Sequence, residues 1–350
     1  MKYPNLYLFY CLLLISCALA GSGRVAIVIS GALDRFVLRS TLMHLIPPLR
    51  IEGYEVDFYA ALSTKHHIPF HEEATYFHHL ATDPVLQSAR SGAFVDLNRV
   101  YNLTSHAIAR AGGFLGGLLL QEMFDYQESP EFQKRFGQVA KGTVLASFPT
   151  SLGKSSIAND NLLHLYYGMS LLWDEVVKVE TYRGEMYDYV LFLRDDTHWL
   201  KLFNITRLLQ RADADVFILS CDARQPKMHS SEVCDFGGLI RRSKAEFWGK
   251  YFEMLLEVDT SKCTEFVRKI YHEKGNGCNS EMILHWLLHM KMLSVAKVEQ
   301  SLLPFQRSVY VQGENGVELC FHKYCESVKQ PLTFTGGNLR CTEWERRHMI

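Results

Sequence analysis

An apolar run that ends abruptly in charged residues constrains the fold of this chain most. Residues 190–193 are Val-Leu-Phe-Leu, and Arg194, Asp195 and Asp196 follow directly. An unbroken apolar run of this length is typical of a strand buried on both faces of a parallel or mixed sheet. The charged residues at its end then lie at the edge of the core, facing solvent or a cation. The run therefore predicts an α/β fold in which a central strand carries two carboxylates at its end.

Strands and helices alternate along the rest of the chain. Predicted strands cover 23–31, 56–62, 216–220 and 292–298, and predicted helices cover 35–50, 162–180, 245–258 and 280–290. Pro47 and Pro48 are expected to close the first helix. The strand-helix-strand opening favours a Rossmann-like, mostly parallel sheet flanked by helices.

The pattern also predicts how the chain is divided. We expect a single main domain over residues 24–310, interrupted by a polar helical insertion over 63–150. An irregular tail that contains cysteines is expected over 311–350. With 350 residues, of which 48% are hydrophobic, the chain can bury a substantial core. The formal net charge is -1 and no long basic run occurs, which argues against nucleic acid as a partner.

The N-terminus has the features of a targeting segment. Lys2 precedes an apolar run over residues 6–20, which ends in Ala-Leu-Ala. This run is shorter than the roughly 20 residues of a membrane-spanning helix and fits a secretory signal peptide cleaved after Ala20. The alternative is a short uncleaved signal anchor, in which case the protein would be held at a membrane. Either way, we expect the rest of the chain to enter the secretory pathway, in the lumen of the Golgi or endoplasmic reticulum or as secreted protein.

Sequons and cysteines agree with that compartment. Asn102 and Asn204 each begin an Asn-x-Thr sequon, an acceptor for an N-glycan where it is exposed. Seven of the nine cysteines follow the targeting segment, all between residues 221 and 341. In an oxidising lumen they predict disulfides, whereas a zinc site lacks the usual C-x-x-C spacing. Cys221 and Cys234, separated by 12 residues across a polar loop, are expected to pair.

The charged end of the central strand has two interpretations. In open α/β sheets, ligands bind in the crevice outside the carboxyl ends of the strands. Asp195 and Asp196 would there hold Mg²⁺ or Mn²⁺, cations that prefer oxygen ligands, and the cation would hold a diphosphate. The alternative is an ordinary Asp-rich turn between a strand and a loop.

Several motifs in order resemble one family. The helix that contains LYYGMSLLWDEV, with Tyr-Tyr near its start, leads to Tyr-Asp, the apolar strand, and then an arginine and acids. Its companions are Ser30-Gly31 with Arg35 shortly after, Asp235-x-Gly-Gly, and Ser280-Glu281 at the start of a helix. Together they resemble poorly characterised glycosyltransferase-like proteins of the secretory pathway, of glycosyltransferase-A type. The resemblance covers residues 24–62 and 160–310.

The resemblance implies a donor, a cofactor and site residues. The donor would be a UDP- or GDP-linked sugar and the acceptor a glycan or a protein. Donor-binding residues would be Ser30, Gly31, Arg35 and Arg194. A divalent metal, Mn²⁺ or Mg²⁺, would be held by Asp195, Asp196 and His322. This chain departs from the family's Asp-x-Asp pattern because its acids are adjacent and Arg194 stands in place of the first acid.

The chemistry of sugar transfer suggests further candidates and leaves alternatives open. An inverting enzyme needs a carboxylate that deprotonates the acceptor hydroxyl, and Asp235 and Glu281 are the candidates. Glu281 has a second interpretation, stabilisation of the helix dipole from the first turn. A non-catalytic relative that keeps the fold as a binding or structural module is one alternative to an enzyme. A sulfotransferase is another, although no 5′-phosphosulfate-binding loop is evident near the first strand.

Overall fold

A seven-stranded sheet forms the centre of the computed structural model, which describes residues 23–33, 36, 38–64, 97–136, 156–220, 233–257, 260–271, 280–299, 301–313 and 316–321. The strand order is β3-β2-β1-β4-β7-β6-β8. The strands are β1 Arg24–Ala32, β2 Glu55–Ser63, β3 Phe114–Gln121, β4 Tyr189–Arg194, β6 Val216–Ser220, β7 Val233–Arg241 and β8 Val295–Val298. Only β7 runs against its neighbours, so the predicted mostly parallel α/β sheet is confirmed.

The apolar run is the buried central strand that the sequence predicts. Val190, Leu191 and Phe192 of β4 are completely buried, and Leu193 nearly so. Alternate side chains point to opposite faces of a strand. Val190 and Phe192 accordingly join one hydrophobic cluster, and Leu191 and Leu193 join the other. The strand therefore holds together two cores rather than one.

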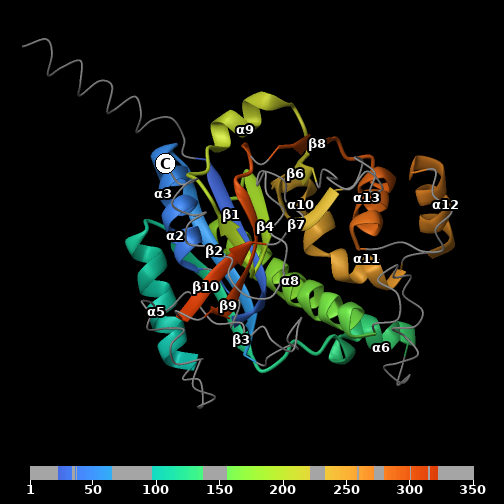
Figure 1. The fold of residues 1–350 in the computed structure, drawn as a ribbon, viewed down its shortest axis with the longest axis horizontal. Helices are drawn as coiled ribbons and strands as arrows, with labels where there is room; N and C mark the ends of the chain where they lie inside the picture. Colours follow the sequence, from blue (N-terminus) through green and yellow to red (C-terminus); the bar gives the residue numbers. More distant parts are fainter. Residues whose placement is uncertain are drawn as a thin grey trace, which may run out of the picture.

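Helices cover both faces of the sheet (Figure 1). One face is covered by α8 Ser156–Arg183, α10 Arg242–Gly249, α11 Tyr251–Glu257 and α13 Ser280–Met290. The other is covered by α2 Leu38–His44, α3 Ile46–Ile51, α5 Leu97–Arg110 and α9 Ile205–Arg211. Shorter elements complete the set: η3 Tyr126–Glu128, α6 Pro130–Phe136 and α12 Thr260–Tyr271. Among the described residues, no helix has the length and apolar character needed to cross a membrane.

A small second sheet starts where the central strand ends. Its order is β10-β9-β5, with β5 Thr197–Trp199, β9 Phe305–Gly313 and β10 Gly316–Phe321. The hydroxyl of Ser40 in α2 fixes β5, since it accepts from the Trp199 N–H at 2.6 Å and donates to the Trp199 carbonyl at 3.1 Å. The expectation of an irregular tail from residue 311 is wrong for residues 311–313 and 316–321, which belong to β9 and β10, and the predicted domain limit at residue 310 falls inside β9.

Two other regions differ from the predicted elements. The helix expected over 35–50 is two helices, and Pro47 lies in the first turn of α3, where a missing N–H costs little. Within the predicted insertion, β3 forms an edge of the main sheet. Gly116 in β3 makes room for the Tyr59 ring, because a Cβ there would lie 2.4 Å from Tyr59 Cζ. Glycines that serve this close approach disguised the strand in the sequence.

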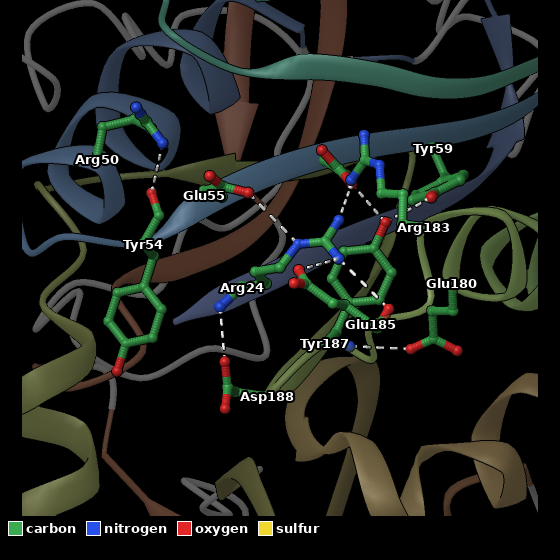
Figure 2. Close-up of polar contacts among 11 residues, drawn as sticks. Arg24, Arg50, Tyr54, Glu55, Tyr59, Glu180, Arg183, Glu185, Tyr187 and Asp188 are labelled. Atoms are coloured by element: carbon green, nitrogen blue, oxygen red, sulfur yellow. Dashed lines mark hydrogen bonds and ion pairs between the residues drawn. The ribbon is translucent and has the colours of Figure 1, made fainter. Parts of the chain in front are cut away.

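The amino ends of β1, β2 and β4 meet in a buried polar group that we call the amino-end cluster: Arg24, Asp57, Tyr59, Arg183 and Tyr187. Figure 2 labels all of its members except Asp57. Asp57 Oδ2 accepts from Arg24 Nη2 at 3.1 Å, from the Tyr187 hydroxyl at 2.5 Å, and from Arg183. The hydroxyls of Tyr59 and Tyr187 lie 2.6 Å apart. The Asp57 carboxylate of β2 thus connects β1, the segment just before β4 and the end of α8.

A second ion pair extends this arrangement. Arg242 Nε and Nη2 donate to Glu180 at 2.7 and 2.5 Å, and the same carboxylate accepts from the Tyr187 backbone N–H at 3.0 Å. The Arg242 guanidinium also lies over the Trp173 ring, 4.5 Å from its centroid. These contacts connect α8, the entrance of β4 and α10 at the amino end of the sheet.

Candidate functional site

The sheet has a topological switch point between β1 and β4. From β1 the chain moves outward to β2 and β3, and it then returns to place β4 on the other side of β1. β1 and β4 are parallel, with Ser30 in register with Arg194. At such a point, the connections leave the carboxyl ends of the two strands in opposite directions and open a crevice where ligands bind.

Arg194, Asp195 and Asp196 lie at this point, and we call them the acidic tip. Arg194 and Asp196 form an ion pair, with Nε 3.3 Å from Oδ1 and Nη2 3.5 Å from Oδ2. Their side chains are only 11% and 2% exposed. With one arginine and two aspartates, the tip has a formal charge of -1. The arginine is thus held in place by the second acid of the sequence motif.

Asp195 makes different contacts from its neighbour. Its backbone N–H donates to the Ser30 carbonyl at 3.1 Å. Its side-chain Oδ2 accepts from the Ala32 N–H at 2.9 Å in a buried setting. Gly31 has φ +152, and a Cβ at this position would lie 2.1 Å from Asp195 Cγ. The missing side chain of Gly31 therefore gives the carboxylate its place against β1.

Ser30 is engaged within the protein. Its side chain is completely buried, and its hydroxyl donates to the Leu165 carbonyl of α8 at 2.7 Å. A Cβ at Gly168 would come within 2.7 Å of the same oxygen. The hydroxyl joins β1 to α8, which gives Ser30 a structural role, and its contact with a donor stays a prediction.

The backbone brings both candidate bases to the same edge of the sheet. Gly237 of β7 pairs with Leu193 of antiparallel β4, so Asp235, two residues earlier, lies beside the acidic tip. Glu281 is in the first turn of α13, which packs against β7 and leads to β8 at the amino end of the sheet. The start of α13 therefore belongs to the carboxyl end. The side chains of Asp235 and Glu281 are outside the description.

The Gly-Gly after Asp235 has a packing role. A Cβ at Gly237 would lie 2.4 Å from the Phe192 carbonyl oxygen, and one at Gly238 would lie 2.9 Å from that of Phe217. Glycine also allows a backbone to come close to a ligand such as a sugar. In the structure this backbone approaches the two neighbouring strands instead, so the glycines do not by themselves indicate a sugar site.

Several other predicted residues lie outside the described part of the structure or are described only by their backbone. Arg35, His322 and Cys221 lie outside the described residues, and of Cys234 only the backbone in β7 is described. The Cys221–Cys234 disulfide therefore stays a prediction. Asn102 is exposed on α5, and Asn204 is exposed at the N-cap of α9.

The described residues do not form a metal site by themselves. Within the described ranges, no group of three His, Cys, Asp or Glu side chains is placed to hold a cation. Asp195 already accepts a backbone hydrogen bond, and Asp196 is paired with Arg194. A metal held by Asp195 and Asp196 together with His322, which lies outside the described residues, stays a prediction.

Two parts of the site could not be predicted from the sequence. The Ala32 N–H contributes through its backbone, and backbone donors leave no residue signature. Ser40 anchors β5, which follows the tip directly, although it is 159 positions from Trp199 in sequence. The only available signal was Gly31, since glycine at the end of a strand marks a close approach.

Sequence comparison identifies no relative, whereas structure comparison finds sugar transferases. No family model matches the chain, and neither does any curated protein sequence. The chain is similar to the galactosyltransferase LgtC solved with donor and acceptor sugar analogues, with 11% identity, a TM-score of 0.31, and 79% of this chain and 73% of that one covered. It is also similar to mouse xyloside xylosyltransferase 1, with 10% identity, a TM-score of 0.34, and 80% of this chain and 86% of that one covered. The likeness to the glycosyltransferase GlyE of Streptococcus pneumoniae TIGR4 has 11% identity and a TM-score of 0.33, and it covers 80% of this chain and 46% of that one.

The three solved structures given above are named as enzymes that transfer sugars. This chain spans less than half the length of GlyE. At such low identities and TM-scores, the likeness does not assign a donor, an acceptor or an activity. The function proposed below is therefore based on the strand order and the acidic tip.

Proposed function

We propose that this protein is a glycosyltransferase-like enzyme that binds a nucleotide-sugar donor between the carboxyl ends of β1 and β4. The observation that carries the proposal is the position of the acidic tip at the switch point of the sheet. An arginine and two carboxylates, nearly buried at the place where this class of sheet binds ligands, need a functional reason beyond a surface turn. The resemblance of the surrounding motifs to glycosyltransferases supplies the substrate class.

Arg194 would contact the diphosphate of the donor. A guanidinium matches phosphate oxygens with paired hydrogen bonds, and the Asp196 ion pair holds it at the tip before the donor arrives. The charge of the leaving diphosphate must be stabilised for the sugar to depart. Asp235 or Glu281, on the same edge of the sheet, would deprotonate the acceptor hydroxyl.

Calorimetric titration with UDP and GDP tests this proposal. We expect one of the two nucleotides to bind the wild-type protein, and the Asp196→Asn variant to bind about tenfold or more weakly because Arg194 loses its partner. Asp213→Asn is the matched control, since it removes a carboxylate that is 95% exposed at the amino end and that pairs, among the described residues, with Arg241. Absence of binding by both nucleotides, with and without Mn²⁺, would exclude a donor site.

One observation favours a non-catalytic binding module as the second candidate. Arg194 replaces an acid of the family pattern and is already neutralised by Asp196. A module of this kind would bind the nucleotide without turning a nucleotide sugar over. Release of UDP or GDP from the corresponding sugar nucleotide, measured with and without glycan acceptors, separates the enzyme from the module.

We also propose that this protein resides in the secretory pathway. The apolar N-terminal run, the exposed sequons at Asn102 and Asn204, and the participation of buried Cys263 in a disulfide support a secretory location. In a secretory host we expect glycosidase treatment to lower the apparent mass of the protein.

Asn204 needs a careful control because its side chain also caps α9. Its Oδ1 accepts from the Arg207 N–H at 2.6 Å. Thr206→Ala destroys the sequon and keeps this cap, whereas Asn204→Ala removes both, at a cost of about 1 kcal/mol for the lost cap. Equal apparent masses of the wild-type protein and the Thr206→Ala variant would show that Asn204 carries no glycan.

A further inference from the structure

The Asp195 carboxylate takes a place that normally belongs to the backbone. In a parallel ladder, one residue donates to a carbonyl on the partner strand and accepts from the N–H two residues further along. Asp195 donates its backbone N–H to the Ser30 carbonyl at 3.1 Å, as this pattern requires. The Ala32 N–H, however, donates to Asp195 Oδ2 at 2.9 Å. The side chain thus continues the ladder by one hydrogen bond where β4 ends at Arg194.

The neighbouring strand is shaped to receive this carboxylate. At Gly31, a Cβ would lie 2.1 Å from Asp195 Cγ and 2.3 Å from its Oδ1. Real Cβ atoms do not approach so closely, so any side chain at residue 31 would displace the carboxylate. Gly31 and Asp195 are therefore matched: one leaves the space and the other fills it.

We propose that Asp195 is a positioning residue, which holds the exit of β1 against the acidic tip, while Arg194 and Asp196 face the donor. This assignment rests on the proposed function for the identity of the ligand. It separates two adjacent acids that the sequence treats as equivalent metal ligands. The exit of β1, where Ser30 and Gly31 lie, and the end of β4 become one rigid support for the donor.

The two positions then require different properties of their side chains. Position 195 needs an acceptor oxygen at the length of an aspartate, and asparagine provides one. Position 196 needs a negative charge, because it holds a buried guanidinium. A pair of metal ligands would behave otherwise, since both would lose an anionic contact to the cation on conversion to asparagine.

Hydrogen exchange without any nucleotide tests the positioning role directly. In the peptide that covers residues 30–33, Asp195→Ala should speed exchange by about tenfold, as expected for the loss of one buried hydrogen bond. Asp195→Asn should restore exchange to within about threefold of wild type, and Asp196→Asn should leave it unchanged. A peptide from β2 serves as the reference that excludes global unfolding. Equal exchange in Asp195→Ala and wild type would overturn the proposal.

Nucleotide affinity provides the second readout. For the nucleotide that binds wild type, Asp195→Asn should keep the affinity within about threefold, and Asp196→Asn should lower it about tenfold or more. Equal losses in both variants, restricted to titrations with Mn²⁺, would show that Asp195 is a metal ligand and would overturn the positioning role. If wild type binds neither UDP nor GDP, the proposed function fails, and hydrogen exchange still decides the role of Asp195.

Discussion

The two ends of the central sheet hold charged side chains in opposite ways. At the amino end, Asp57 lies between Arg24, Arg183 and Tyr187, which come from different elements. At the carboxyl end, the acidic tip consists of three consecutive residues, and its ion pair joins Arg194 to a residue two positions away. The amino-end cluster connects strands and helices to one another, whereas the ion pair of the tip lies within three consecutive residues, at the place where we propose that the donor binds.

This difference suggests two roles: the charged residues of the amino-end cluster stabilise the fold, whereas those of the acidic tip serve function. A buried carboxylate with several partners stabilises the arrangement of those partners, and removal of one member leaves the others without compensation. The contacts described for the tip join β4 to the exit of β1. We therefore expect substitutions at the amino end to lower stability and substitutions at the tip to change ligand binding.

The largest effect is expected for Asp57→Ala. Its side chain is 4% exposed, and its loss leaves Arg24 and Arg183 without their shared carboxylate. The free energy of unfolding should fall by about 3 to 5 kcal/mol, the range for breaking a buried ion pair. Urea denaturation measures the change.

The control for that substitution is Glu55→Ala. Glu55 lies 3.5 Å from Arg24 Nε, but its side chain is 54% exposed. Exposed ion pairs contribute about 0 to 1 kcal/mol, so this variant should stay close to wild type. Similar losses in the two variants would remove the distinction between a stabilising cluster and a surface pair.

The next effect is expected for Gly31→Ala, which tests the tip. The new methyl group would collide with the Asp195 carboxylate, and φ +152 is unfavourable for alanine. Unfolding free energy should fall by about 2 to 3 kcal/mol, and nucleotide binding should be lost.

Gly53→Ala is the matched control for this steric effect. Gly53 has φ +90 and nothing within 4 Å of its Cβ position, so only backbone strain remains. It should cost about 1 kcal/mol and leave nucleotide affinity unchanged. If Gly31→Ala resembles Gly53→Ala in both measurements, the close fit of Asp195 against β1 is not required for binding.

A smaller effect, with a specific pH dependence, is expected for Tyr187→Phe. Removal of the hydroxyl between Asp57 and Tyr59 should cost about 1 to 2 kcal/mol near neutral pH. Burial, followed by the charges of Tyr59 and Asp57, raises the pKa of the Tyr187 hydroxyl above its ordinary value of 10.0. The folded protein keeps this proton when the unfolded chain has lost it.

The sign of the pH effect follows from that raised pKa. The contribution of Tyr187 is complete below the unfolded pKa and is lost as the pH rises above about 10. Thermal denaturation between pH 9 and 11 should therefore show a smaller loss of stability in Tyr187→Phe than in wild type. Parallel curves would mean that this hydroxyl titrates alike in both states.

The contrast between the two ends of the sheet also explains which features could be predicted from the sequence. The central strand and the acidic tip are contiguous, so periodicity and a short motif predicted both. The amino-end cluster is assembled from residues as far apart as Arg24 and Tyr187, and no local pattern connects them. Long-range ionic contacts depend on the strand order, which the sequence determines only through the complete fold.

The missed elements have separate physical reasons. β3 was hidden because two of its residues are glycines that accommodate Tyr59, and glycine weakens a strand pattern. The end of β9 and the whole of β10 fall in the tail that was expected to be irregular from residue 311, although β9 pairs with β5 next to the tip. At the site, the motif indicated which residues gather, but the division of roles between Asp195 and Asp196 depends on a backbone N–H that no motif contains.

Hydrogen exchange with and without the nucleotide that binds tests the central claim most directly. We expect saturating UDP or GDP to slow exchange in peptides that cover residues 30–33 and 194–199, at the carboxyl ends of β1 and β4. Peptides that cover residues 52–57 and 183–188, at the amino end, should exchange at the same rate in both states. Protection at the amino end without protection at the acidic tip would contradict a donor site between β1 and β4.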